Sequence, residues 1–202
     1  MKVKLTVSDS KKLFHEQLPY VISGLYKRIV DEMLVELNLL NHQNEFVQDD
    51  FFCIGLTETF KELTKGYKPD EHLIPLFESL CNSSNFEPKK IKDISKRTLE
   101  EFKEKSLKEI SVLLKEKSTS NLYSSRMLNL GIYLIISNAT DFKDIKDSEK
   151  NKTISDIFDK LNLSFNKAEK DIGIYKSILV RMEQAKELLQ EAKIKANKEK
   201  KN

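Results

Sequence analysis

The residues best suited to binding a metal ion are histidines, and their spacing does not favour a site. The chain has three, His15, His42 and His72, which lie in different segments and form neither an HExxH nor a His-x-x-His pattern. Metal sites that can be recognised in a sequence bring ligands together at short, fixed spacings, so a lone histidine is a weak signal. We therefore interpret all three as surface or rim histidines.

A second candidate for chemistry is an acidic group, Asp31, Glu32 and Glu36. Di-iron centres in helical bundles use inward-facing glutamates, and some of these are followed by a histidine three residues later. A valine follows Glu32 at that spacing and a leucine follows Glu36, so the required histidines are missing. The favoured interpretation is a solvent-exposed face on which Arg28 and Glu32 lie one helical turn apart. A metal site is the weaker alternative.

Motifs for catalysis and phosphate binding are missing from the sequence. The five glycines are spread through the chain and form neither a GxxxxGK[ST] loop nor a GxGxxG fingerprint. No spacing suggests a Ser-His-Asp or Cys-His arrangement, although such groups assemble in space and the sequence leaves that alternative open. The sequence predicts a protein that is not an enzyme, with no catalytic, cofactor-binding or metal-binding residue and no cofactor.

Charge and hydropathy narrow the classes of partner. The 202-residue chain has 35 Lys and Arg against 32 Asp and Glu, a net charge of +3, which is too small for a nucleic-acid binder that must neutralise many phosphates. Hydrophobic residues make up 39% and charged residues 33%, which argues against a membrane-embedded or a disordered chain. The longest apolar run, residues 127–139, is too short to span a bilayer, so membrane contact would be peripheral.

The N-terminus and the cysteines indicate the compartment. The first twelve residues, MKVKLTVSDSKK, lack the apolar segment of a secretory signal and the composition of a transit peptide, so we expect no cleaved leader. Cys53 and Cys81 lie in apolar helical settings without a CxxC partner or a neighbouring histidine. These features are typical of reduced core cysteines in an intracellular protein. A disulfide between the two remains the open alternative.

The apolar spacing of the chain predicts helices, and the strongest helical pattern lies at residues 20–40. Its apolar residues recur at steps of three and four and form one broad stripe, which is typical of an amphipathic helix. The stripe consists of Ile22, Leu25, Tyr26, Ile29, Val30, Met33, Leu34, Leu37 and Leu40. We predict a central helix that buries this stripe against other helices and exposes its charged face.

Helices are also predicted over most of the remaining chain, from capping residues, breakers and apolar spacing. The expected segments are 8–17, 51–66, 70–85, 88–114, 124–138 and 155–161, followed by a last helix that begins at Ser164 or Asn166. We expect residues 141–153, which are rich in lysine and aspartate, to form an exposed loop. The only strand-like fragment is VKLTV at residues 3–7.

The last helix has a pattern of its own. Its apolar residues alternate steps of four and three from Ala168 to Met182, and the next step, to Ala185, breaks a strict heptad. This predicts a coiled-coil-like helix of about 30 residues. The predicted architecture is all-α, a helical bundle domain at residues 1–163 with an extended C-terminal helix and basic tail at residues 164–202.

The basic tail offers a second way for the chain to act. Residues 193–201, KIKANKEKK, could contact anionic lipid at the end of an amphipathic helix. The preceding stripe has few aromatic residues, however, and Glu187, Glu191 and Glu199 dilute the positive charge. A partner-binding coiled coil is therefore favoured, with a peripheral lipid-binding protein as the alternative.

Several segments are similar to one known family. They are TVSDSK (6–11), VDEMLVELNLL (30–40), GLTETF (55–60), GYKP (66–69), LFESLCNSSNFEP (76–88), YSSRMLNLGIYLI (123–135) and the start of the last helix (171–185). The match is weakest at residues 89–117 and 141–153, and the basic tail looks short. On these segments the chain resembles the thylakoid formation proteins, also called photosystem II biogenesis proteins.

The resemblance implies a non-enzymatic accessory protein for thylakoid membrane biogenesis and for photosystem II assembly or repair. It implies as partners a membrane-bound ATP-dependent metalloprotease of the AAA type and photosystem II assembly intermediates, and no nucleic acid. The implied location is peripheral, on the cytoplasmic side of the thylakoid membrane, with a soluble cytoplasmic pool. The missing transit peptide suggests a cyanobacterial member.

The residues suggest where such a partner would bind. We predict docking on the C-terminal helix and on the charged face of the central helix. The candidate interaction residues are Arg28, Asp31, Glu32, Arg126, Tyr175, Leu179, Met182 and Leu189. For the four charged candidates, ion pairs between helices of the same chain are an equally open interpretation.

Overall fold

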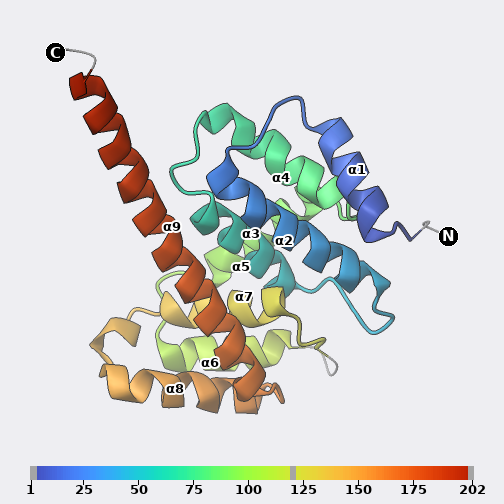
Figure 1. Ribbon diagram of the computed structural model, residues 1–202. Helices are drawn as coiled ribbons and strands as arrows, with labels where there is room; N and C mark the ends of the chain where they lie inside the picture. Colours follow the sequence, from blue (N-terminus) through green and yellow to red (C-terminus); the bar gives the residue numbers. More distant parts are fainter. Residues whose placement is uncertain (1–3, 119–121, 200–202) are drawn as a thin grey trace.

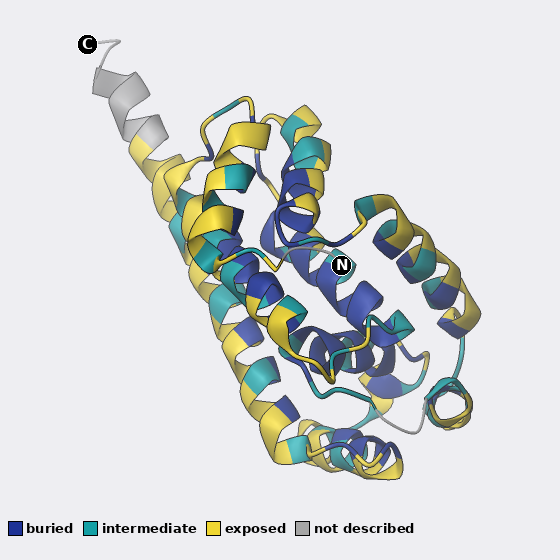
Figure 2. Cartoon of the chain, turned by 90° about the vertical axis from the view of Figure 1, so that its right-hand side faces the viewer, coloured by how far each residue is buried: buried dark blue, intermediate teal, exposed yellow. Residues whose placement is uncertain are grey.

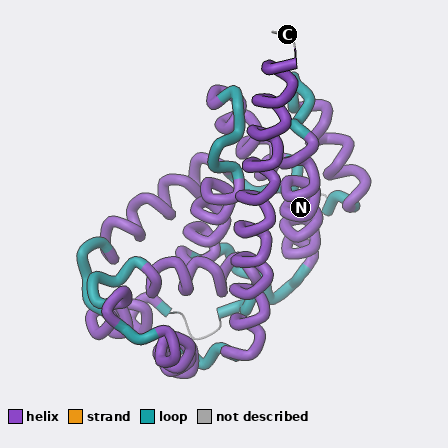
Figure 3. Tube along the Cα trace, turned by 60° about the vertical axis from the view of Figure 1, so that its left-hand side comes forward, coloured by secondary structure: helices purple, strands orange, loops and turns teal. Residues whose placement is uncertain are grey.

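The computed structural model describes residues 4–118 and 122–199, with side chains as far as residue 192. Within these ranges every regular element is a helix (Figure 3), which confirms the all-α prediction. The helices are α1 (Val7–Gln17), α2 (Gly24–His42), α3 (Asp50–Leu63), η1 (Asp70–His72), α4 (Leu73–Asn82), α5 (Pro88–Phe102), α6 (Leu107–Lys117), α7 (Arg126–Ser137), η2 (Phe142–Asp144), α8 (Asp147–Lys160) and α9 (Phe165–Glu199).

The centre of the molecule is a close crossing of α3 and α7. A Cβ atom built on Gly55 of α3 would lie 1.7 Å from the carbonyl oxygen of Met127, and one on Gly131 of α7 would lie 2.0 Å from that of Phe51. The two backbones touch because neither glycine has a side chain. Phe51 and Met127 are buried, so this crossing forms the middle of the core.

The other helices pack around this crossing. Helix α5 packs on α3, whereas α2 packs with α1 and α4 on another side (Figure 1). Helix α9 contacts α7, α3 and α8, and so it ties the last third of the chain to the middle. Buried residues gather where the helices face one another, and exposed residues cover the outer surfaces (Figure 2).

Several predicted helix starts are wrong by a few residues. The helix expected from residue 70 begins as α4 at Leu73, after the short η1, and the one expected from residue 124 begins as α7 at Arg126. Helix α1 begins at Val7, capped by Thr6 rather than by a serine, because Thr6 and Asp9 form a reciprocal capping box. Helix α2 begins at Gly24, not at Tyr20. The Tyr20 ring stacks on His72 at 3.5 Å and its hydroxyl donates to the His72 carbonyl oxygen, which holds this segment outside the helix.

The predicted lengths of one helix and one loop are also wrong. The charged helix expected at residues 88–114 is two helices, because Glu104 adopts a left-handed backbone (φ 57°) and Ser106 starts α6 with a capping box to Glu109. The loop expected at residues 141–153 instead contains η2 and the first half of α8. Acidic residues in the first turn of α8, Asp147 among them, favour a helix start.

The cysteines are free and buried, as predicted. Burial raises the pKa of both thiols, Cys53 and Cys81, to about 12. They stay protonated at physiological pH and behave as small apolar core residues.

Helix α9 is 35 residues long, and its two halves differ. Its first half packs on the body through the buried side chains Ala168, Ile172, Tyr175 and Met182. From Glu187 to Ala192 every side chain is exposed, and the helix projects away from the other helices (Figure 1). The side chains of the predicted basic tail, residues 193–201, lie outside those described. In the described ranges, no helix has the length and apolar character needed to cross a membrane.

Candidate protein-interaction surface

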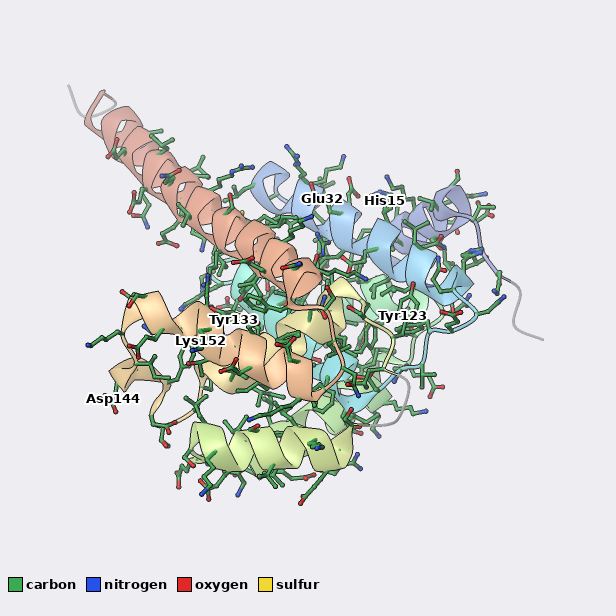
Figure 4. All side chains as sticks on the ribbon, turned by 90° about the horizontal axis from the view of Figure 1, so that it is seen from below. His15, Glu32, Tyr123, Tyr133, Asp144 and Lys152 are labelled. Carbon is green, nitrogen blue, oxygen red and sulfur yellow. The ribbon has the colours of Figure 1, made fainter. Side chains whose placement is uncertain are left out.

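The charged face of α2 is solvent-accessible at Arg28 and Glu32, as predicted, but the prediction is wrong for Glu36, whose side chain is only 16% exposed because it pairs with Arg126. The Arg28 Nε donates to the Glu32 Oε1 at 2.9 Å, and the Arg28 side chain is 84% exposed. Figure 4 shows Glu32 on this helix, and Asp31 beside it is half-buried. An exposed pair one turn apart contributes only about 0.3–0.5 kcal/mol to stability. Both charges therefore remain available to another molecule at little cost.

Arg126 instead joins two helices. Its Nε donates to Oε2 of Glu36 at 2.7 Å, and a second guanidinium N–H donates to the same oxygen. The pair connects α7 to α2 and is largely covered, with side-chain exposures of 27% and 16%. Burial raises the pKa of Glu36; Arg126 opposes that shift, and Asp171 adds to it. For Arg126 the interpretation as an ion pair between helices is thus the one observed.

The polar contacts continue from α7 to α9. The Asn129 Nδ2 donates to Oδ2 of Asp171 at 2.7 Å, and Asn129 is fully buried. The Lys167 ammonium donates to the Ser124 carbonyl oxygen. These contacts hold the base of α9 in register with α7, because a buried amide is costly to leave unpaired.

Grooves lie on both sides of the Arg28–Glu32 pair. One, of about 830 Å³, runs between α1, α2 and the segment before α7. Its lining includes Lys11, Lys27, Asp31, Leu39, Tyr123 and Arg126. The other, of about 390 Å³, lies between α2 and α9. Because Arg28 and Glu32 line both grooves, their ion pair forms the ridge between them.

The four candidate interaction residues on α9 differ in burial: some lie in the core and others lie on the surface. Tyr175 and Met182 are buried at 5% and 6% exposure, and burial raises the pKa of Tyr175 to about 12. Leu179 is half-buried against the core, and Leu189 is 50% exposed. An interaction role stays a prediction for all eight candidate residues. Tyr175 and Met182 already have a structural role as core side chains.

The histidines occupy rim positions, as predicted. His42 Nε2 lies 2.8 Å from the Leu5 carbonyl oxygen, His72 stacks on Tyr20, and exposed His15 lies beside Phe14. Among the residues that the structure describes, no cluster of His, Cys, Asp and Glu could hold a metal ion.

Comparison with known proteins gives full-length matches. Residues 6–202 match the family model described as thylakoid formation protein. A protein Thf1 from Prochlorococcus marinus subsp. pastoris is 85% identical over 201 residues, which cover 100% of both chains. Protein Thf1 from Parasynechococcus marenigrum (strain WH8102) is 36% identical over 192 residues, 95% of this chain and 90% of that one.

A solved structure shares the fold. The structure of Psb29 at 1.55 Å matches with a TM-score of 0.86 and 22% identity, and the match covers 98% of this chain and 100% of that one. None of these proteins is named as an enzyme. The resemblance found in separate segments thus extends over nearly the whole length, and the chain belongs to the thylakoid formation protein family.

Proposed function

We propose that the protein is a non-enzymatic accessory factor in thylakoid membrane biogenesis and in photosystem II assembly or repair. We propose further that it works by binding a membrane-bound ATP-dependent protease and photosystem II assembly intermediates. The observation that carries the proposal is the family match over residues 6–202, since the family is named for thylakoid formation. The protease and photosystem II are inferences beyond that name.

The far half of α9 supports a binding role. Leu188 and Leu189 are 66% and 50% exposed, in the part of α9 that projects beyond the other helices. A helix that buries no face of its own gains stability when it packs against another protein. This part of α9 is therefore the segment best placed to meet a partner without disturbing the core.

The structure sets the boundary for a deletion test. Removing the chain from Asp171 onward would also remove Ile172, Tyr175 and Met182 from the core. Deleting residues 187–202 removes only the projecting part of α9 and the tail. We expect this deletion to leave thermal unfolding unchanged and to reduce capture of the protease from detergent-solubilised thylakoid membranes by about tenfold, or roughly 1.4 kcal/mol.

Two controls make the deletion informative. The full-length double variant Leu188→Ser/Leu189→Ser keeps the basic tail and should lose the protease as the deletion does. Val112→Ser, which changes a side chain 53% exposed on α6, should bind normally. Unchanged protease capture by the deletion would contradict the proposal. If the protein floats with anionic liposomes at low salt and no longer does so as salt rises, the lipid-binding alternative is favoured instead.

A further inference from the structure

Helix α9 carries two apolar stripes rather than one. The first faces the body and consists of Ala168, Ile172, Tyr175, Leu179 and Met182. It ends at Lys186, whose side chain lies over Gly66. The second repeats at steps of four and three and consists of Ile174, Ile178, Arg181, Ala185, Leu188 and Ala192. The irregular step from Met182 to Ala185 is thus a change from one stripe to the other.

The second stripe borders the groove between α2 and α9. Ile174, Ile178, Arg181 and Ala185 line that groove from the α9 side together with Met182 of the first stripe, and α2 contributes apolar side chains to its lining. Ile174 is 49% exposed, so the groove is open to a ligand. The stripe continues past the body to Ala192, about 27 Å at 1.5 Å per residue. This length and spacing fit a second helix lying alongside.

Arg181 is the only charged residue in this stripe. It is exposed, and it makes no hydrogen bond or ion pair within the ranges that the structure describes. Arg28, on the opposite wall, differs because Glu32 already pairs with it. A helix laid over the stripe would remove the Arg181 guanidinium from water, which is strongly unfavourable unless the partner supplies a carboxylate.

We propose that this groove binds an amphipathic helix of a protein partner, with an apolar stripe interrupted by one aspartate or glutamate at the level of Arg181. The inference rests on the proposed function and adds the chemistry of the partner. A second copy of this chain fits poorly, because pairing the two stripes at Arg181 would place two guanidinium groups together. A single charged seam position is a known means of selecting a partner helix.

Defined peptides test this directly. One peptide has about three heptads with leucine at the seam positions and a central glutamate, and its twin carries lysine at that position. We expect the glutamate peptide to bind the full-length protein about tenfold or more tightly than the lysine peptide, by fluorescence anisotropy. The Arg181→Glu variant should reverse the preference. Arg97→Glu, an exposed arginine on α5, should leave it unchanged.

The outcomes that would overturn this inference differ from those that would overturn the proposed function. Equal affinity for the two peptides, no binding of either, or no reversal in folded Arg181→Glu protein would contradict a charge-selective groove. Self-association of the wild-type chain that Leu188→Ser abolishes would make a second copy the occupant. Protease capture that depends on residues 187–202 while the peptides are not distinguished would refute this inference and leave the proposed function standing. If the protein distinguishes the two peptides but captures no protease, the proposed function is refuted and the charge-selective groove stands.

Discussion

Replacing Gly131 by alanine will destabilise the protein by about 3 kcal/mol or more. Helix propensity alone predicts the opposite sign, since alanine is favoured over glycine inside a helix by about 1 kcal/mol. At Gly131, however, the new methyl group would lie 2.0 Å from the Phe51 carbonyl oxygen, which is backbone and cannot move aside cheaply. The α3–α7 crossing would have to open, with loss of core packing on both sides. Gly55→Ala should behave in the same way.

Urea unfolding followed by circular dichroism measures the effect. Gly173→Ala is the matched control, because Gly173 also lies within a helix but has open space around it. We expect this control to be neutral or to stabilise by about 0.5–1 kcal/mol. A Gly131→Ala variant as stable as the wild type would show that the helices do not meet at this distance.

Replacing Arg126 by methionine will cost about 2–3 kcal/mol near pH 8, because it leaves the Glu36 carboxylate covered and unpaired. Burial already raises the pKa of Glu36 in the folded protein, and the loss of Arg126 removes the main effect that opposes the shift. An acid whose folded-state pKa is raised destabilises the fold once it is ionised. The cost should therefore appear as pH rises through the folded-state pKa and shrink as pH falls toward the unfolded-state value.

Thermal unfolding at about pH 5 and about pH 8 tests this sign. The Arg126→Met variant should approach the wild type at the lower pH and fall well below it at the higher pH. The double variant Arg126→Met/Glu36→Gln removes the uncompensated charge and should recover much of the stability at high pH. A cost that is independent of pH would show that Arg126 stabilises the fold through packing alone.

The helical class and most segments follow from local signals. Apolar steps of three and four predict α2, and Ser125 and Asp49 cap their helices through side-chain oxygens as capping chemistry leads one to expect. The sequence also contains a signal for the break between α5 and α6, because Ser106 and Glu109 have the spacing of a capping box. The apolar residues on both sides of it nevertheless continue one stripe, and periodicity alone favoured a single helix.

The candidate surface was less predictable. Arg28 and Glu32 pair within one helix, so their spacing sufficed. Arg126 and Glu36 are 90 positions apart, and no local pattern joins them. On α9, a stripe typical of a coiled coil does not reveal whether the body or another protein covers it. Tyr175 and Met182 turn inward, whereas Leu188 and Leu189 remain exposed.

We propose that the protein acts by binding a protein partner along α9. Crosslinking in native thylakoid membranes, with a photo-crosslinking amino acid in place of Leu188 and mass spectrometry of the products, tests it most directly. A matched probe in place of Val112 on α6 gives the background. We predict that position 188 crosslinks to a subunit of a membrane-bound ATP-dependent protease, and that position 112 does not. Products from position 188 that contain lipid alone, or the same products from both positions, would contradict binding of a protein partner along α9.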